Sequence, residues 1–181
     1  MLVDKGEDKM DYKSSIRVIE DFPTEGISFK DITTLLKDGP VFKAAIHDLA
    51  QFAKKQGAEV IVGPEARGFV VGCPLAFELG VGFVPVRKQG KLPAETISAS
   101  YTLEYGSDAL AMHKDAIQPG QKVLVADDLL ATGGTISTTI NLVKQLGGEV
   151  VGVAFFIELT ELEGRKRLHE YDVYSLIQYE K

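Results

Sequence analysis

The fold is decided by the stretch Val123-Leu124-Val125-Ala126-Asp127-Asp128-Leu129-Leu130-Ala131-Thr132-Gly133-Gly134-Thr135. Its first four residues are apolar, which is typical of a strand buried on both faces in a parallel sheet. Two carboxylates and a turn of small residues follow, and we expect a helix to begin near Thr135. The stretch therefore predicts a strand–turn–helix unit of an open α/β sheet.

The same stretch predicts a binding site, because ligands of open α/β sheets bind beyond the carboxyl ends of the strands. The small residues before the helix offer N–H groups, hydroxyls and a positive dipole end, which suit a phosphate. Asp127 and Asp128 are hydrogen-bond acceptors, so they suit sugar hydroxyls or a metal-bound water. A ribose 5-phosphate group combines a phosphate with nearby hydroxyls.

Composition limits the function classes. The 181 residues are 45% hydrophobic and 25% charged, which suits one globular domain with a sizeable core. The net charge of −6 argues against a nucleic-acid or anionic-membrane partner. Cys73 is the only cysteine, so the chain has no internal disulfide and fits a reducing cytoplasm. We expect its side chain to be a small buried hydrophobe.

The rest of the chain alternates strands and helices. We expect a disordered extension over 1–10 and a short amphipathic helix around 16–19. A helix starts at Asp38-Gly39-Pro40 and ends at Gly57. Further patterns predict a helix over 70–79, a hairpin over 94–113 with its turn at 106–108, and strands at 60–62, 83–86, 150–157 and 173–177. Pro85 weakens the prediction of the strand at 83–86, unless that strand lies at an edge.

A second candidate ligand loop follows the strand at 60–62 and reads Gly63-Pro64-Glu65-Ala66-Arg67-Gly68-Phe69. The planar fork of Arg67 suits a phosphate. The alternative is a surface ion pair between Arg67 and Glu65. A basic run, Arg87-Lys88-Gln89-Gly90-Lys91, ends the next strand and supplies the positive charge that an anionic substrate needs.

Both loops resemble motifs of the type I phosphoribosyltransferases. The acid pair with Ala-Thr-Gly-Gly-Thr resembles that family's phosphoribosyl pyrophosphate (PRPP) motif. The 63–69 loop resembles the pyrophosphate loop of the adenine-specific members, which usually reads Glu-Ser-Arg-Gly-Phe; here Ala66 replaces the serine. The sequence Tyr101-Thr102-Leu103-Glu104-Tyr105-Gly106 is close to their lid motif, Tyr-Ser-Leu-Glu-Tyr-Gly.

The resemblance implies a role for each matching residue. The ribose hydroxyls and the 5′-phosphate would be bound by Asp127, Asp128, Ala131, Thr132, Gly133, Gly134 and Thr135. Pyrophosphate would be bound by Glu65, Ala66, Arg67, Arg87, Lys88 and Lys91. The adenine site would comprise Ser28, Phe29, Lys30 and Leu159, with Glu104 and Arg67 as catalytic residues. Mg²⁺ would be held mainly by substrate and water, without protein ligands.

The implied fold is the α/β type I phosphoribosyltransferase fold: a mostly parallel central sheet flanked by helices. One domain would span 11–181, with a hood over about 11–35 and a flexible hairpin lid over about 88–113. The implied reaction is purine salvage, in which adenine and PRPP give AMP and pyrophosphate in a cytoplasmic homodimer. Two alternatives stay open: a related enzyme that uses another base, and a non-catalytic regulator that senses ribose phosphates.

Overall fold

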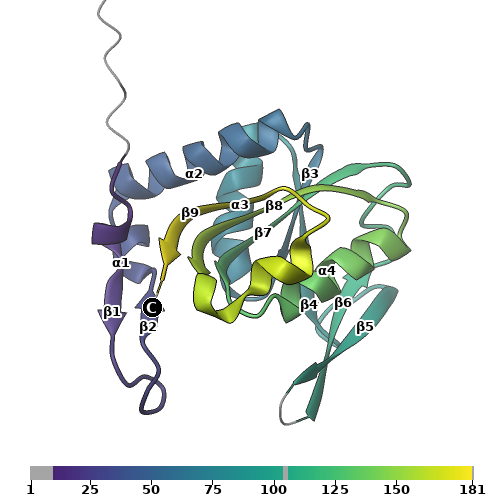
Figure 1. Cartoon of the computed structure of the whole chain (residues 1–181). Helices are drawn as coiled ribbons and strands as arrows, with labels where there is room; N and C mark the ends of the chain where they lie inside the picture. Colours follow the sequence, from purple (N-terminus) through teal and green to yellow (C-terminus); the bar gives the residue numbers. More distant parts are fainter. Residues whose placement is uncertain (1–9, 104–105, 181) are drawn as a thin grey trace, which may run out of the picture. The chain divides into compact units, whose positions relative to one another are not determined.

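The computed structural model describes residues 10–103 and 106–180 (Figure 1). The chain divides into two compact units, Met1–Ala45 and Ile46–Lys181. Of the expected extension over 1–10, Met10 alone lies within the described residues, and it is exposed. The loop residues 104–105, which include Glu104, lie outside them.

The first unit contains a small antiparallel hairpin. The elements of this unit are the short helix η1 (Lys13–Ser15), the hairpin strands β1 (Arg17–Ile19) and β2 (Phe29–Asp31), α1 (Thr33–Leu36) and the start of α2 (Gly39–Lys55). The predicted helix around 16–19 is wrong, because Arg17 pairs with Asp31 across the hairpin through both backbone register and an ion pair. This cross-strand pairing outweighs the weak helical periodicity of three apolar residues.

Helix α2 starts where the sequence predicts. The carboxylate of Asp38 accepts a hydrogen bond from the N–H of Val41 at 3.2 Å, which satisfies one donor of the first turn. The chain leaves the helix at Gly57, whose positive φ of 71° suits a glycine.

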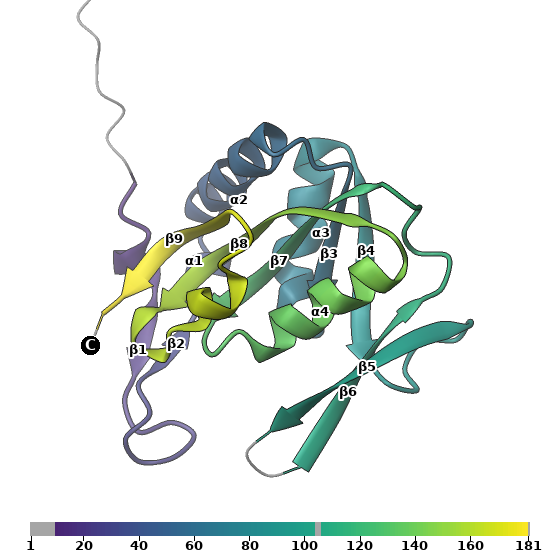
Figure 2. The ribbon, with the colours of Figure 1, turned by 45° about the vertical axis from the view of Figure 1, so that its right-hand side comes forward.

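The second unit is built on a seven-stranded sheet in the order β5-β6-β4-β3-β7-β8-β9. The four strand pairs from β4 to β9 are parallel, whereas β6 is antiparallel to both β4 and β5. Figure 2 shows β5 and β6 as a twisted ribbon that extends beyond the end of β4. The strands are β3 (Val60–Pro64), β4 (Gly82–Lys88), β5 (Thr96–Leu103), β6 (Gly106–His113), β7 (Lys122–Leu130), β8 (Glu149–Leu159) and β9 (Val173–Tyr179).

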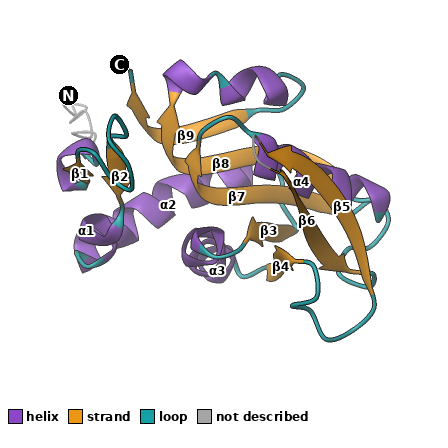
Figure 3. Ribbon diagram, turned by 90° about the horizontal axis from the view of Figure 1, so that it is seen from below, coloured by secondary structure: helices purple, strands orange, loops and turns teal. Residues whose placement is uncertain are grey.

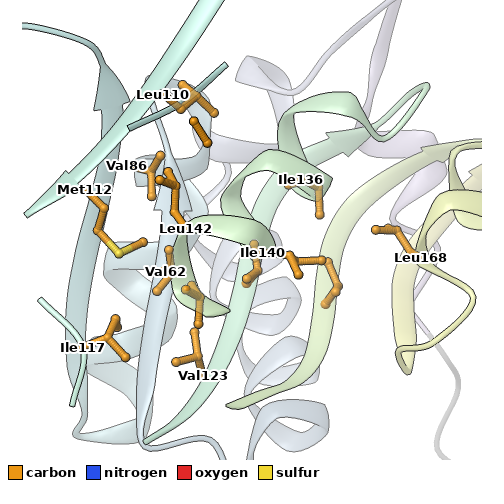
Figure 4. Close-up of a cluster of buried hydrophobic side chains, with 14 of the residues drawn as sticks. Val62, Val86, Leu110, Met112, Ile117, Val123, Ile136, Ile140, Leu142 and Leu168 are labelled. Atoms are coloured by element: carbon orange, nitrogen blue, oxygen red, sulfur yellow. The ribbon is translucent and has the colours of Figure 1, made fainter. Parts of the chain in front are cut away.

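Helices cover both faces of this sheet (Figure 3). One face carries α3 (Arg67–Leu79) and the part of α2 that belongs to this unit, and the other carries α4 (Gly134–Gln145). Val62 and Val125 pack in one apolar cluster with Ile140 of α4, as Figure 4 shows for Val62 and Ile140. Burial on both faces explains why the parallel strands read as continuous apolar runs.

Three local expectations meet different outcomes. The turn predicted at 106–108 is wrong, because residues 106–108 belong to β6. Gly106 already pairs with Leu103, the last residue of β5. Pro85 is tolerated because β4 pairs with β6 only at its last two residues, which leaves position 85 without a neighbour on that side. Cys73 is exposed rather than buried, since α3 turns Val71 and Leu75 toward the sheet instead.

Candidate active site

A cavity of about 320 Å³ lies at the carboxyl ends of β3 and β7. Both candidate ligand loops contribute to its wall, although some 60 residues separate them in sequence. The lining residues are Glu65, Ala66, Arg67, Asp127, Asp128, Leu129, Leu130, Ala131, Thr132, Gly133, Gly134, Thr135 and Ile136. Sequence reasoning missed Leu129, Leu130 and Ile136, although they are contiguous with the motif that it singled out.

The wall on the β7 side is a helix N-terminus preceded by a tight turn. Gly133 has a φ of 80° and directly precedes α4, which begins at Gly134 as expected to within one residue. The N–H of Ser137 donates to the carbonyl of Gly133, while the N–H groups of the preceding turn have no acceptor within the helix. Those N–H groups, together with the hydroxyls of Thr132 and Thr135, form a donor-rich lining.

The acid pair lies inside β7, which extends through to Leu130 rather than ending before the carboxylates. Asp127 accepts a hydrogen bond from the N–H of Asp128 at 2.8 Å. Asp128 is buried, and its Oδ2 atom lies 3.1 Å from Nε of Arg67 without hydrogen-bond alignment, so that oxygen has no hydrogen-bond partner among the described residues. A buried carboxylate oxygen without a donor is costly, which points to a ligand that supplies one.

The environment of the acid pair disfavours its double ionisation. Burial raises the pKa of Asp127 well above its usual range, and the neighbouring charge of Asp128 raises it further. Burial also raises the pKa of Asp128, and the Arg67 guanidinium opposes that rise. Adjacent carboxylates at a cavity wall with raised pKa values are typical of a functional site.

Close packing at Gly68 brings the two loops together. A Cβ atom at this position would lie 2.8 Å from Cδ of Pro64 and 3.0 Å from Oδ1 of Asp127. Only a glycine therefore lets the first turn of α3 approach both β3 and β7. This approach places the Arg67 side chain beside Asp128.

Glu65 serves as an anchor for the basic run rather than as a surface partner of Arg67. Its side chain is only 10% exposed, and its Oε2 accepts a hydrogen bond from Nε of Arg87 at 2.7 Å. Its Oε1 accepts from the N–H of Lys88 at 3.2 Å and lies 3.5 Å from Nζ of Lys91. Burial acts to raise the pKa of Glu65, but these donors outweigh it and lower the pKa.

The predicted adenine residues divide between the two units. In the first unit, Lys30 Nζ donates to Ser28 Oγ at 2.6 Å, and Phe29 packs edge to face against Phe22 at 5.2 Å between ring centroids. Leu159 ends β8 in the second unit. The structure thus places ten predicted residues around one cavity and connects the basic run to it through Glu65, and the adenine assignments stay predictions.

The comparisons with known proteins agree with this arrangement. The phosphoribosyl transferase domain family matches residues 33–180. The adenine phosphoribosyltransferase of Brevibacillus brevis is 70% identical over 170 residues, which cover 94% of this chain and 100% of that protein. The chain belongs to the adenine phosphoribosyltransferase family. It is accordingly a phosphoribosyltransferase.

Solved structures of this family share the fold. That of the Thermoanaerobacter pseudethanolicus adenine phosphoribosyltransferase is 56% identical, covers 92% of this chain and 97% of its own, and has a TM-score of 0.89. The Saccharomyces cerevisiae enzyme, solved with D-2,5-dideoxy-2,5-imino-altritol 1,6-bisphosphate and adenine, is 39% identical, covers 91% of this chain and 95% of its own, and has a TM-score of 0.87. The predicted type I phosphoribosyltransferase fold is confirmed.

Two features are absent from the part of the chain that the structure describes. No helix in this part of the chain is long and apolar enough to cross a membrane. No group of three or more His, Cys, Asp or Glu side chains within it is placed to hold a metal ion.

Proposed function

We propose that this chain catalyses the Mg²⁺-dependent transfer of the 5-phosphoribosyl group from PRPP to adenine, giving AMP and pyrophosphate in purine salvage. One observation carries the proposal: a single cavity joins a donor-rich helix N-terminus, a buried carboxylate oxygen without a hydrogen-bond partner, and an arginine. A 5-phosphorylated ribose supplies the complementary groups, since its phosphate accepts hydrogen bonds and its hydroxyls donate them.

The ribose phosphate is bound by the β7–α4 loop. The N–H groups and hydroxyls of residues 131–135 surround the 5′-phosphate. Asp127 and Asp128 accept hydrogen bonds from the 2′- and 3′-hydroxyls, which supplies the donor that Oδ2 of Asp128 lacks. Such donors also favour the ionised carboxylates that burial disfavours.

The pyrophosphate leaving group needs positive charge that is already in place. As the bond from C1′ breaks, positive charge develops on the sugar and negative charge on the pyrophosphate. Arg67, with the backbone of Ala66, faces the leaving group from the cavity wall, while Glu65 holds Arg87, Lys88 and Lys91 next to it. Mg²⁺, which substrate and water would hold in this proposal, would supply further positive charge at the same place. Arg87 also reaches the site of a partner subunit in this proposal.

The proposal assigns Phe29 and Leu159 to apolar contacts with adenine, and assigns hydrogen bonds to its six-membered ring to backbone groups around Ser28 and Lys30. Glu104 contacts the five-membered ring and assists the loss of its proton. The 39% identical yeast relative was solved with adenine, which supports this choice of base. The hood over about 11–35 and the lid over about 88–113, within one domain over 11–181, belong to the same proposal; a lid would exclude water from the reactive sugar.

A steady-state assay with Mg²⁺ and each of adenine, hypoxanthine, guanine and xanthine tests the reaction. We expect AMP from adenine, with the other bases far poorer, and loss of activity on chelation of Mg²⁺. Equal turnover of hypoxanthine contradicts the base assignment and favours a related enzyme with a different base. PRPP binding without turnover of any base favours the regulator.

We also propose that the protein is a cytoplasmic homodimer. The single cysteine suits a reducing compartment. An apolar stripe on the outer side of α3 supports association of two copies: Val70 and Phe77 are exposed, Phe77 to 88%, and Cys73 lies between them.

A further inference from the structure

The proposed phosphate-binding loop, residues 131–135, packs against a backbone segment that belongs to none of the motifs described above. After β8 the chain forms two short helices, η2 (Thr160–Leu162) and η3 (Gly164–Leu168), drawn yellow-green in Figure 2 beside the N-terminal end of α4. A Cβ atom at Gly164 would overlap the carbonyl oxygen of Ala131, and one at Gly133 would lie 3.0 Å from the carbonyl oxygen of Gly164. Loop and η3 therefore touch backbone to backbone at two points.

This close contact makes the loop conformation depend on the position of η3. The N–H groups that line the cavity belong to the residues directly after the contact, and Gly133 is already in a left-handed conformation. A small displacement of Gly164 would change where those N–H groups point. Groups that bind a phosphate through several donors are sensitive to shifts well below 1 Å.

The position of η3 is held by an ion pair between the buried carboxylate of Glu158 and the half-exposed guanidinium of Arg165. Glu158, whose side chain is 5% exposed, accepts hydrogen bonds from Nε of Arg165 at 2.8 Å and from its Nη2. Nη1 of Arg165 donates to the carbonyl of Val173 at 3.0 Å. Arg165, the residue next to Gly164, is thus connected to the carboxyl end of β8 and to the start of β9.

The Glu158 carboxylate accepts hydrogen bonds from two further side chains. Oε2 of Glu158 also accepts from Oγ of Ser175 at 2.8 Å and from Nε2 of Gln178 at 3.2 Å. The hydrogen bonds from Arg165 lower the pKa of Glu158 despite its burial, so the pair stays charged. A two-point hydrogen-bonded pair of this kind favours one geometry, because displacing Arg165 leaves the buried Glu158 carboxylate without two of its donors.

We propose that the Glu158–Arg165 pair is a positioning device for the phosphate-binding loop, acting through Gly164. It rests on the proposed function, in that the ligand of the loop is a ribose 5-phosphate group. Neither side chain lines the cavity, so the pair binds no substrate in this proposal. Its effect is on the affinity for the phosphorylated sugar and not on the affinity for the base.

The test uses a double variant, Glu158→Gln with Arg165→Met, which removes both charges so that no buried charge is left unpaired. The matched control is Lys166→Met in the same short helix, because the Lys166 side chain is 73% exposed and pairs with the exposed Glu163. Titration calorimetry with ribose 5-phosphate measures the loop directly. We expect the double variant to bind about tenfold more weakly than wild type, and the control to bind within about twofold of it.

Gly164→Ala perturbs the loop from the other side while keeping the ion pair, and we expect the same loss of affinity. Arg165→Lys, which keeps the charge but loses the fork, should give an intermediate affinity. In the activity assay, the KM for PRPP should rise in parallel while the KM for adenine stays within about twofold.

The inference is overturned if the double variant binds ribose 5-phosphate as the control does, or if both KM values rise together with a lowered Tm. The proposed function fails separately, if wild type binds ribose 5-phosphate but makes no AMP. Absence of ribose 5-phosphate binding by wild type overturns both.

Discussion

Replacing Gly68 by alanine tests how closely the two ligand loops must pack. The new Cβ atom would lie 2.8 Å from Cδ of Pro64, 3.0 Å from Oδ1 of Asp127 and 3.3 Å from the carbonyl oxygen of Ala126. Pro64 and Ala126 belong to central strands and cannot yield, so the first turn of α3 must move away from the sheet by several tenths of an ångström. Overpacking of this kind costs about 1–3 kcal/mol.

Two measurements follow from that displacement. For a chain of this size the Tm should fall by about 2–4 °C for each kcal/mol lost. Because Arg67 moves with the helix, the KM for PRPP should rise by about tenfold, while the KM for adenine changes far less. Differential scanning calorimetry and steady-state kinetics give the two values.

Gly39→Ala is the matched control, because a Cβ atom there meets nothing within 4 Å and the residue has no positive φ. We expect the control to be as stable as wild type or slightly more stable, by up to about 1 kcal/mol. A Gly68→Ala protein with the Tm of wild type and an unchanged KM for PRPP would refute the reasoning. The two loops would then have room for a methyl group that the packing excludes.

Three further substitutions test the site and the assembly. Asp127→Asn should stabilise the ligand-free protein near pH 8. Burial raises the pKa of Asp127, so ionising this carboxyl lowers the stability of the folded wild type as the pH rises above about 4. The stability difference between variant and wild type should therefore vanish below that pH. Urea unfolding at both pH values measures this, and kcat/KM for PRPP should fall at least about tenfold; a destabilised variant at pH 8 contradicts the electrostatic account. Arg67→Ala should raise the KM for PRPP at least about tenfold and leave the affinity for AMP within about twofold. Lys55→Ala, at an exposed position, is the control. Unchanged kinetics of the Arg67 variant would remove Arg67 from the site. Phe77→Asp should halve the mass in light scattering with a stability change within about 0.5 kcal/mol, because the side chain is 88% exposed; a persistent dimer would place the interface elsewhere.

Much of the site was predictable because its elements are short and contiguous. Residues 123–135 carry the strand, the acid pair, the turn and the helix start in one run, so local pattern is enough to place them. The loop at 63–69 was predictable in the same way, from a buried strand followed by a glycine-rich helix start. What these two runs share is that backbone geometry, rather than a distant partner, decides their structure.

Errors arose where a distant segment decides. Ile16, Val18 and Ile19 fit a helix by spacing, but their segment is a strand because Asp31 pairs with Arg17 across the hairpin. The position of Glu65 likewise depends on a distant segment, because its side chain is nearly buried and pairs with Arg87 and Lys91 of the basic run. Cys73 reads as a core residue in an apolar helix, and only the orientation of α3 on the sheet exposes it.

The sequence by itself predicted most strands and helices of the second unit, the two candidate ligand loops and the chemistry of the ligand they suit, because periodicity, glycines and helix starts are local properties of the chain. Only the tertiary structure decided which charged groups meet: Arg67 with Asp128, Glu65 with Arg87, and Glu158 with Arg165. The physical reason is that an ion pair in a folded protein depends on the approach of separate strands and helices, and that approach is set by packing across the whole sheet, which no local pattern records.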